Sequence, residues 1–171
     1  ILKLRRRGVE ALAQAAGRRP VVVQGLESPQ QVQRLLSALW PAGTSDASFW
    51  LPLLGAVAWV ESRGDTLAVS PTGALGLMQL TSFVWYPTVE QAINPFDPAA
   101  SVLRARDQLD ELLERAARGD GPGGLDPIVV MLGAYKEGWR GFTEGGPRRA
   151  QGIDYARKVL AVNRELSRRS R

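Results

Sequence analysis

The sequence predicts a mainly α-helical fold with one small turn or hairpin segment, on three observations. Apolar residues recur at helical spacing along most of the chain, and Pro and Gly residues mark where those stretches begin and end. Residues 64–80 gather three glycines and a proline, a composition typical of turns. The chain has 171 residues, 44% of them apolar, which is enough to bury the core of one domain.

Two short helices are expected before residue 45. The first covers residues 2–16, is basic, and stops at Gly17. The second begins with the capping-box pattern of Ser28 and Gln31, with Pro29 at the first helical position. Its apolar face consists of Val32, Leu35, Leu36 and Leu39.

An amphipathic helix must bury its apolar face, either on its own chain or on a partner. The short Pro-containing linker over residues 41–44 favours packing on the same chain. We therefore expect an N-terminal helical extension over residues 1–44 and the main domain over residues 45–171.

The next helix is expected from about Phe49 to Ser62, with Pro52 tolerated only in its first turn and Gly64 as terminator. Turns or a small hairpin follow over residues 64–80.

Asp-Pro pairs begin two further helices. The first starts at Asp97, ends at Gly119 and has an apolar stripe. The second starts at Asp126 and is apolar nearly all round, so it should be buried. A Gly-rich loop is expected over residues 139–150, before a last helix. The apolar positions of that last helix are Ile153, Ala156, Val159, Leu160 and Leu166.

Composition narrows the chemistry, because the chain has no cysteine and no histidine. Disulfides, thiolate or imidazole metal sites, and Ser-His-Asp triads are excluded. Acid/base chemistry must come from Asp, Glu, Lys or Tyr.

The net charge is +5, with basic residues gathered at both ends, which suits either a polyanionic partner or solvated termini. No stretch is long and apolar enough to span a bilayer. The chain begins at Ile1 without a signal-peptide pattern, so we expect a mature or trimmed chain.

Glu61 is the carboxylate best suited to catalysis. Asp97 and Asp126 are explained as helix caps. The acidic residues between positions 107 and 114 share their helix with arginines and predict an ion-paired, solvated face. Glu61 instead closes an apolar helix next to Val57 and Ala58. A carboxyl group held against apolar surface keeps its proton more easily and can act as a general acid.

The residues around Glu61 resemble the core motif of soluble-type (SLT) lytic transglycosylases, which have a lysozyme-like helical fold. The matching residues are Glu61-Ser62, then Ser70, then Gly73-Ala74-Leu75-Gly76-Leu77-Met78-Gln79. The family's Ala-Tyr-Asn-x-Gly motif is similar to Ala134-Tyr135-Lys136-Glu137-Gly138, and its final helix matches at Tyr155 and Val159-Leu160. The resemblance covers residues 50–165.

This resemblance implies a set of site residues. Glu61 is the catalytic residue, and the saccharide contacts fall on Ser70, Met78, Gln79, Tyr135, Lys136 and Tyr155. Two departures stand out. Lys136 replaces the family's asparagine, and is either a partner for the acidic groups of the substrate or a lysine at a helix end. Thr66 stands where proline is common.

The resemblance also implies a reaction and a setting. Glu61 protonates the oxygen between N-acetylmuramic acid and N-acetylglucosamine, then takes a proton from the muramoyl C6 hydroxyl, which forms a 1,6-anhydro end. No metal or cofactor is needed. The partner is peptidoglycan, in the periplasm or cell envelope, with a secretion-system or envelope complex as a further partner; no nucleic acid is expected.

Three alternatives remain open. A hydrolytic lysozyme would need a second carboxylate, for which Asp65 and Glu137 are the candidates. A non-catalytic wall-binding module and a nucleic-acid binder are the others.

Single residues of the motifs also have structural alternatives. Met78 and Tyr135 could be core residues, and Gly73 and Gly76 could serve only a tight turn. The tryptophans suit either a sugar groove or the core, and none is singled out: Trp40, Trp50, Trp59, Trp85 and Trp139.

Overall fold

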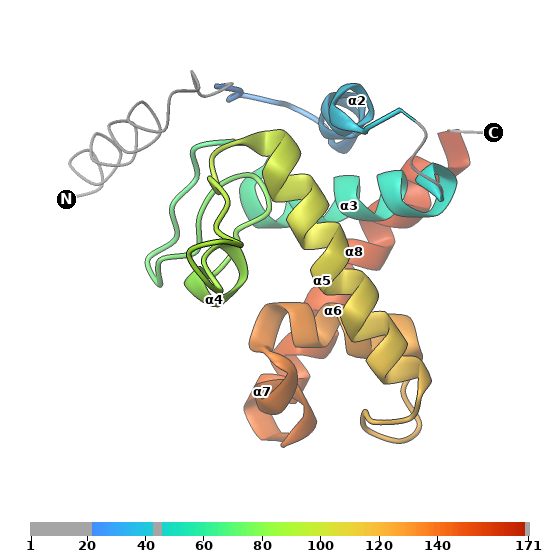
Figure 1. The fold of residues 1–171 in the computed structure, drawn as a ribbon. Coiled ribbons are helices and arrows are strands. Elements are labelled where there is room, and N and C mark those ends of the chain that lie inside the picture. The colour runs from blue at the N-terminus through green and yellow to red at the C-terminus, as the bar shows by residue number, and fades with distance from the viewer. Residues whose placement is uncertain (1–21, 43–45, 170–171) are drawn as a thin grey trace. The chain divides into compact units, whose positions relative to one another are not determined.

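The computed structural model describes residues 22–42 and 46–169, which are mainly helical as predicted (Figure 1). The chain forms two compact units, one up to Ala105 and one from Arg106. Helix α5, Pro98–Ala117, carries the chain from the first unit into the second. The helix expected over residues 2–16 lies outside the described residues, and the domain boundary expected at residue 44 stays a prediction.

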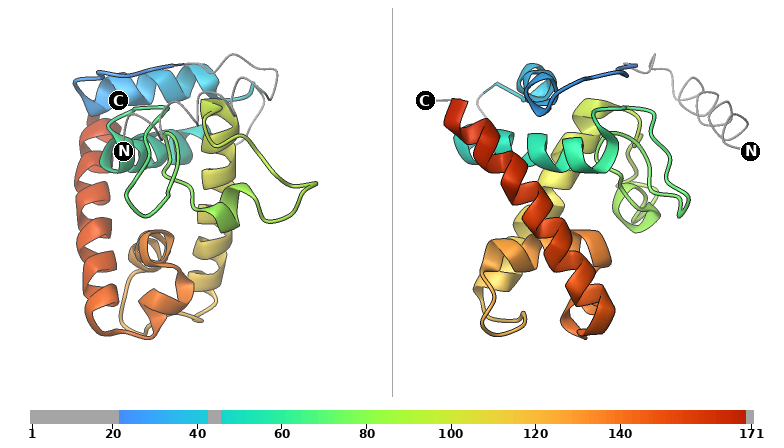
Figure 2. Two further views of the ribbon diagram at one scale, coloured as in Figure 1. Left: turned by 90° about the vertical axis from the view of Figure 1, so that its left-hand side faces the viewer. Right: turned by 180° about the vertical axis from the view of Figure 1, so that it is seen from behind.

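In the first unit, α2 (Pro29–Leu39) packs against α3 (Ala47–Ser62), and the views of Figure 2 show α2 lying across α3. The Ser28 side chain caps α2 by accepting a hydrogen bond from the Gln31 backbone N–H. Val32 and Leu36, from its predicted apolar face, are fully buried. The amphipathic helix therefore buries its stripe on its own chain.

Helix α3 begins at Ala47, earlier than expected, so Pro52 lies in its interior rather than in its first turn. Proline lacks the N–H that would reach the carbonyl of Ser48, and the exposure of Ser48 lets water solvate that group. The rest of the helix is strongly apolar, and its buried residues run from Trp50 almost unbroken to Ala58.

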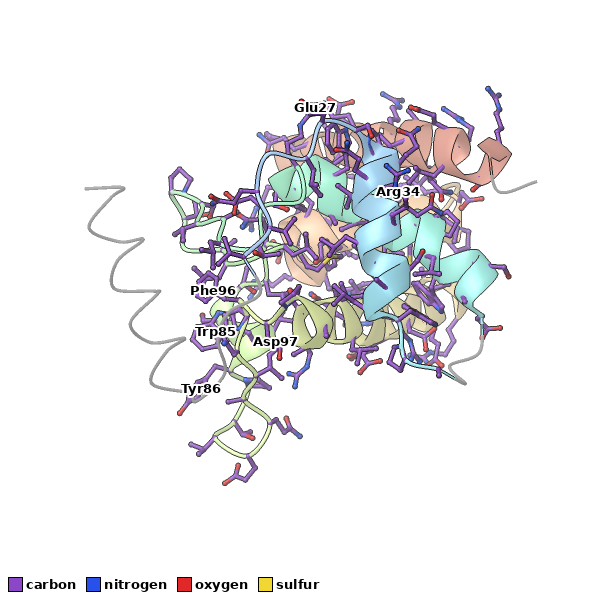
Figure 3. The ribbon with its side chains drawn as sticks, turned by 90° about the horizontal axis from the view of Figure 1, so that it is seen from above. Glu27, Arg34, Trp85, Tyr86, Phe96 and Asp97 are labelled. Atoms are coloured by element: carbon purple, nitrogen blue, oxygen red, sulfur yellow. The ribbon has the colours of Figure 1, made fainter. Side chains whose placement is uncertain are left out.

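Residues 64–80 form turns with two isolated antiparallel bridges, Val69 to Leu75 and Leu75 to Leu80. This confirms the expected turn or hairpin segment. The short helix α4, Ser82–Trp85, was not predicted, because four residues are too few for helical periodicity to show. In Figure 3, the loop beyond Tyr86 extends away from α4.

Helix α5 begins where predicted, because the Asp97 carboxylate accepts hydrogen bonds from the backbone N–H groups of Ala99 and Ala100. The expected ion-paired face is only partly present. Arg106 approaches Asp107 at 3.6 Å. The guanidinium of Arg104 instead donates to one backbone carbonyl of α4 and to one of the loop after it. The guanidinium of Arg115 lies over the ring of Trp139. The buried positions of the apolar stripe are Val102, Ala105, Leu109 and Ala116.

The second unit contains α6 (Pro127–Glu137), α7 (Trp139–Thr143) and α8 (Gly146–Arg169), which pack on one another. Asp126 caps α6 by accepting the Ile128 N–H at 2.8 Å. The α6 residues from Val130 to Ala134 are buried, as its apolar sequence predicts.

The expectation of a Gly-rich loop over residues 139–150 is wrong, because that stretch holds α7 and the first turn of α8. The reason is the fully buried ring of Phe142. A Cβ at Gly133 would lie 2.2 Å from this ring and one at Gly152 2.6 Å from it, so α6 and α8 both contact the ring through glycines. Packing of one aromatic side chain thus overrides the loop tendency of the glycines.

Candidate active site

Glu61 is the penultimate residue of α3 and is partly exposed. Val57 and Ala58, one turn earlier on the helix, are fully buried. The helix ends with Arg63 in a left-handed conformation, whose N–H donates to the carbonyl of Trp59. Glu61 therefore stands at the edge between the apolar body of α3 and solvent.

Ser62 connects this helix end to the Met78-Gln79 segment. Its hydroxyl lies 2.7 Å from the carbonyl oxygen of Leu77 and 3.1 Å from that of Ala58, and the Gly64 N–H donates to its Oγ. Sequence reasoning gave Ser62 no role, although it is the second residue of the motif. The contact places the backbone just before Met78 next to the residue that follows Glu61.

Ser70 shapes its own turn. Its Oγ accepts the Ala74 N–H at 2.9 Å, its N–H donates to the Ala74 carbonyl, and its hydroxyl lies 3.1 Å from that of Thr72. The side chain is partly exposed. Because a hydroxyl carries one donor and two acceptor sites, Ser70 can still interact with a ligand while it holds the turn.

Gln79 is held from both sides of the turn segment. Its backbone has φ +50°, in the left-handed region, and its side-chain amide donates to the carbonyls of Gly76 and Ala68, at 2.9 and 3.2 Å. A non-glycine residue in this conformation persists only when its surroundings fix it. Met78, next to it, is fully buried, as the core alternative expects.

The two motif glycines differ. A Cβ at Gly76 would lie 2.0 Å from the carbonyl oxygen of Pro95, so the backbones of these two residues are in direct contact. A Cβ at Gly73 would meet nothing within 4 Å. Glycine is favoured there only because the backbone has φ +88°, which residues with a side chain rarely adopt. Gly73 thus fits the tight-turn explanation, whereas Gly76 also brings the motif against the chain before α5.

Tyr135, Lys136 and Tyr155 belong to the second unit, so their part in a site with Glu61 stays a prediction. Within that unit the Lys136 ammonium lies 5.3 Å from the centroid of the Tyr155 ring. Lys136 is exposed in the last turn of α6, Tyr135 is partly exposed, and Tyr155 is buried.

Both candidates for a second carboxylate are engaged elsewhere. Asp65 Oδ1 accepts hydrogen bonds from the Leu67 N–H and the Gln24 side chain. Glu137 lies 3.5 Å from the guanidinium of Arg148. These contacts give both carboxylates a structural role.

Three of the five tryptophans are buried or covered by an arginine within their own unit. Trp50 is buried, and the rings of Trp59 and Trp139 are covered by the guanidinium groups of Arg63 and Arg115, respectively. In the described part of the chain, no three Asp or Glu side chains are arranged to hold a metal ion. No helix among the described residues is long and apolar enough to cross a membrane.

Comparison with known proteins shows the family of the chain. The family model described as Transglycosylase SLT domain matches residues 39–144. The membrane-bound lytic murein transglycosylase F of Maricaulis maris (strain MCS10) is 36% identical over 102 residues, which cover 58% of this chain and 21% of that protein. The matched region thus spans about a fifth of the length of that relative. With more than half of its length matched by the family model, the chain belongs to the SLT-domain transglycosylase family.

Proposed function

We propose that the protein is a lytic transglycosylase that cleaves the β-1,4 bond between N-acetylmuramic acid and N-acetylglucosamine in peptidoglycan. The observation that supports this best is the position of Glu61. It is a partly exposed carboxylate at the end of an apolar helix, and Ser62 ties it to the Met78-Gln79 segment. Membership of the SLT family supplies the substrate class.

One carboxyl group can perform both proton transfers of this reaction. Glu61 begins protonated and donates its proton to the glycosidic oxygen as the bond to C1 of the muramoyl residue breaks. The Glu61 carboxylate then accepts the proton of the muramoyl C6 hydroxyl, whose oxygen bonds to C1. The products are a 1,6-anhydromuramoyl end and a free hydroxyl on the leaving sugar, with no water consumed and the catalyst restored.

Glycosidases usually need two carboxylates, and the second either activates a water or attacks the anomeric carbon. The intramolecular hydroxyl removes the need for an activated water, and the N-acetyl group of the substrate can assist at C1. The structural contacts of Asp65 and Glu137 favour this scheme over a hydrolytic lysozyme.

The saccharide contacts are proposed on both units. Ser70, Gln79, Tyr135 and Lys136 are at least partly exposed and can reach a ligand directly. Met78 and Tyr155 are buried, so we propose that each supports the exposed contact residues of its own unit. The Lys136 ammonium suits the lactyl or stem-peptide carboxylate of the substrate.

The proposed substrate places the enzyme in the cell envelope, and the name of its relative as a membrane-bound murein transglycosylase is consistent with that location. The periplasm and association with an envelope or secretion complex remain predictions from the sequence resemblance.

The test is the replacement Glu61→Gln, which keeps the shape of the side chain but cannot donate a proton. Purified peptidoglycan is digested with the wild-type chain, with Glu61→Gln, and with Glu111→Gln as a control at an exposed position on α5. We expect anhydromuropeptides by mass spectrometry from the wild type and the control, and a loss of about 10²–10⁴-fold with Glu61→Gln.

Two results would overturn the proposal. A folded Glu61→Gln variant with near wild-type activity would remove Glu61 as the catalyst. Reducing ends that carry ¹⁸O after digestion in labelled water would show hydrolysis in place of the internal transfer.

A further inference from the structure

Residues 22–27, here called the N-terminal strap, contact the turn that follows Glu61. The strap precedes the part of the chain that the SLT family model matches, residues 39–144. Figure 3 shows the strap running beside the loops after α3 to Glu27, where α2 begins. It is thus a segment outside the matched domain that lies against the candidate active site.

The main contact joins Val23 to Thr66. The Val23 N–H donates to the Thr66 hydroxyl oxygen at 3.0 Å, and the Thr66 N–H donates to the Val23 carbonyl at 3.1 Å. Thr66 is fully buried. Both interactions need groups that a proline at position 66 would lack, namely a backbone N–H and a hydroxyl. The threonine thus provides the attachment point for the strap.

Two further contacts extend the attachment. The Gln24 side-chain amide donates to Asp65 Oδ1 at 3.0 Å, and the same oxygen accepts the Leu67 N–H. A Cβ at Gly64 would lie 2.6 Å from Leu26 Cδ1, so the Leu26 side chain packs directly on this glycine. The strap therefore contacts three consecutive residues, 64–66.

The turn is consequently fixed from two directions. The strap holds residues 64–66, and the Ser62 hydroxyl holds the helix end to Leu77. Glu61 directly precedes this fixed stretch, so movement of the turn would change the direction of its carboxyl group. Catalytic groups lose efficiency steeply when they are displaced from the productive geometry.

We infer that the N-terminal strap is a positioning element for Glu61, with Thr66 and Gln24 as the residues through which it acts. The inference rests on the proposed function of Glu61. Neither residue is assigned a contact with the substrate. Loss of the strap contacts should therefore reduce kcat and leave KM nearly unchanged.

The test compares Thr66→Val with Thr66→Ser in the full chain, on soluble glycan strands of defined length. Valine removes the hydroxyl and nearly keeps the shape, whereas serine retains the acceptor for the Val23 N–H. We expect Thr66→Val to lower kcat about 10-fold, as small displacements of a catalytic group do, and Thr66→Ser to restore most of it. Thr81→Val, at an exposed position in the same unit, is the matched control and should equal the wild type.

Gln24→Ala provides a second variant, because Gln24 is exposed and its loss should not unfold the chain. We expect a smaller loss of kcat, together with faster amide hydrogen exchange over residues 64–67. If Thr66→Val does not fold, the kcat and the amide exchange of Gln24→Ala alone test the positioning role of the strap. Wild-type kcat and wild-type exchange in Gln24→Ala would then overturn the inference, as would a folded Thr66→Val with wild-type kcat.

The two proposals fail in different ways. If Glu61→Gln digests peptidoglycan as fast as the wild type, the proposed function is wrong. If Glu61→Gln is inactive while folded Thr66→Val keeps full kcat, the function stands and the strap has no positioning role.

Discussion

The hydroxyl of Ser62 donates a hydrogen bond to the carbonyl oxygen of Leu77 at 2.7 Å. This contact crosses from the end of the Glu61 helix to the residue just before Met78. It joins the two halves of the motif that lie on either side of the turns, so the spacing of the motif reflects a physical connection. The same hydroxyl also reaches back to the carbonyl of Ala58, one turn earlier.

Ser62→Ala should lower both stability and activity. It removes the bond to Leu77 and leaves the Gly64 N–H without its Oγ acceptor, a loss of about 1–3 kcal/mol in the free energy of unfolding. Ser37→Ala is the control, because Ser37 is exposed and its hydroxyl bonds only back within α2, to the carbonyl of Gln33. Thermal unfolding and peptidoglycan clearing measure the two effects. Equal behaviour of both variants would mean that the Leu77 contact contributes nothing.

The two motif glycines should respond differently to alanine. Gly73→Ala meets open space and should cost about 1–2 kcal/mol of stability for its positive φ. Gly76→Ala must in addition displace the backbone at Pro95, and should cost at least about 3 kcal/mol. Chemical denaturation of the two variants measures this difference. Equal losses would show that the contact between Gly76 and Pro95 relaxes freely.

The sequence predicts the helices that have strong local signals. Ser28, Asp97 and Asp126 each cap a helix in the structure as their positions predict. Capping depends on groups within three residues of one another, so it can be read from the chain without tertiary information. The position of Glu61 at a helix end was likewise predictable from the apolar run before it and the glycine after it.

The parts that were not predictable depend on long-range packing. Helix α7 exists because Phe142 enters a space left by Gly133 and Gly152, and no local pattern reveals that pairing. The contact of Thr66 with Val23 spans 43 residues in the sequence. Its only trace in the sequence was the departure of Thr66 from the proline common at that position.

Arg104 should hold the loop after α4 in place. Its two terminal nitrogens donate to the carbonyls of Val84 and Gln91, at 2.7 and 2.6 Å. Arg104→Gln cannot bridge both carbonyls, so this loop should open more often and be cut faster by chymotrypsin near the exposed Phe83 and Tyr86.

The control for the loop is Arg118→Gln, because Arg118 is exposed and its ion pair with Asp120 is long, at 3.8 Å. This variant should be cleaved at the wild-type rate. If Arg104→Gln resists the protease equally well, the carbonyl contacts of Arg104 are dispensable for holding the loop.

Lys136 offers a test of charge in the proposed site. If its ammonium attracts the acidic groups of peptidoglycan, Lys136→Met should lower the rate at low ionic strength and lower it less at high salt, because salt screens exposed charges. Lys136→Arg keeps the charge and should retain the wild-type salt dependence. Lys158→Met, at an exposed position on α8, controls for a general loss of positive charge.

The position of Lys136 over the Tyr155 ring predicts a separate loss of about 0.5–1 kcal/mol in stability for Lys136→Met. A variant with reduced stability but unchanged rate and salt dependence would give Lys136 a structural role and no part in substrate binding.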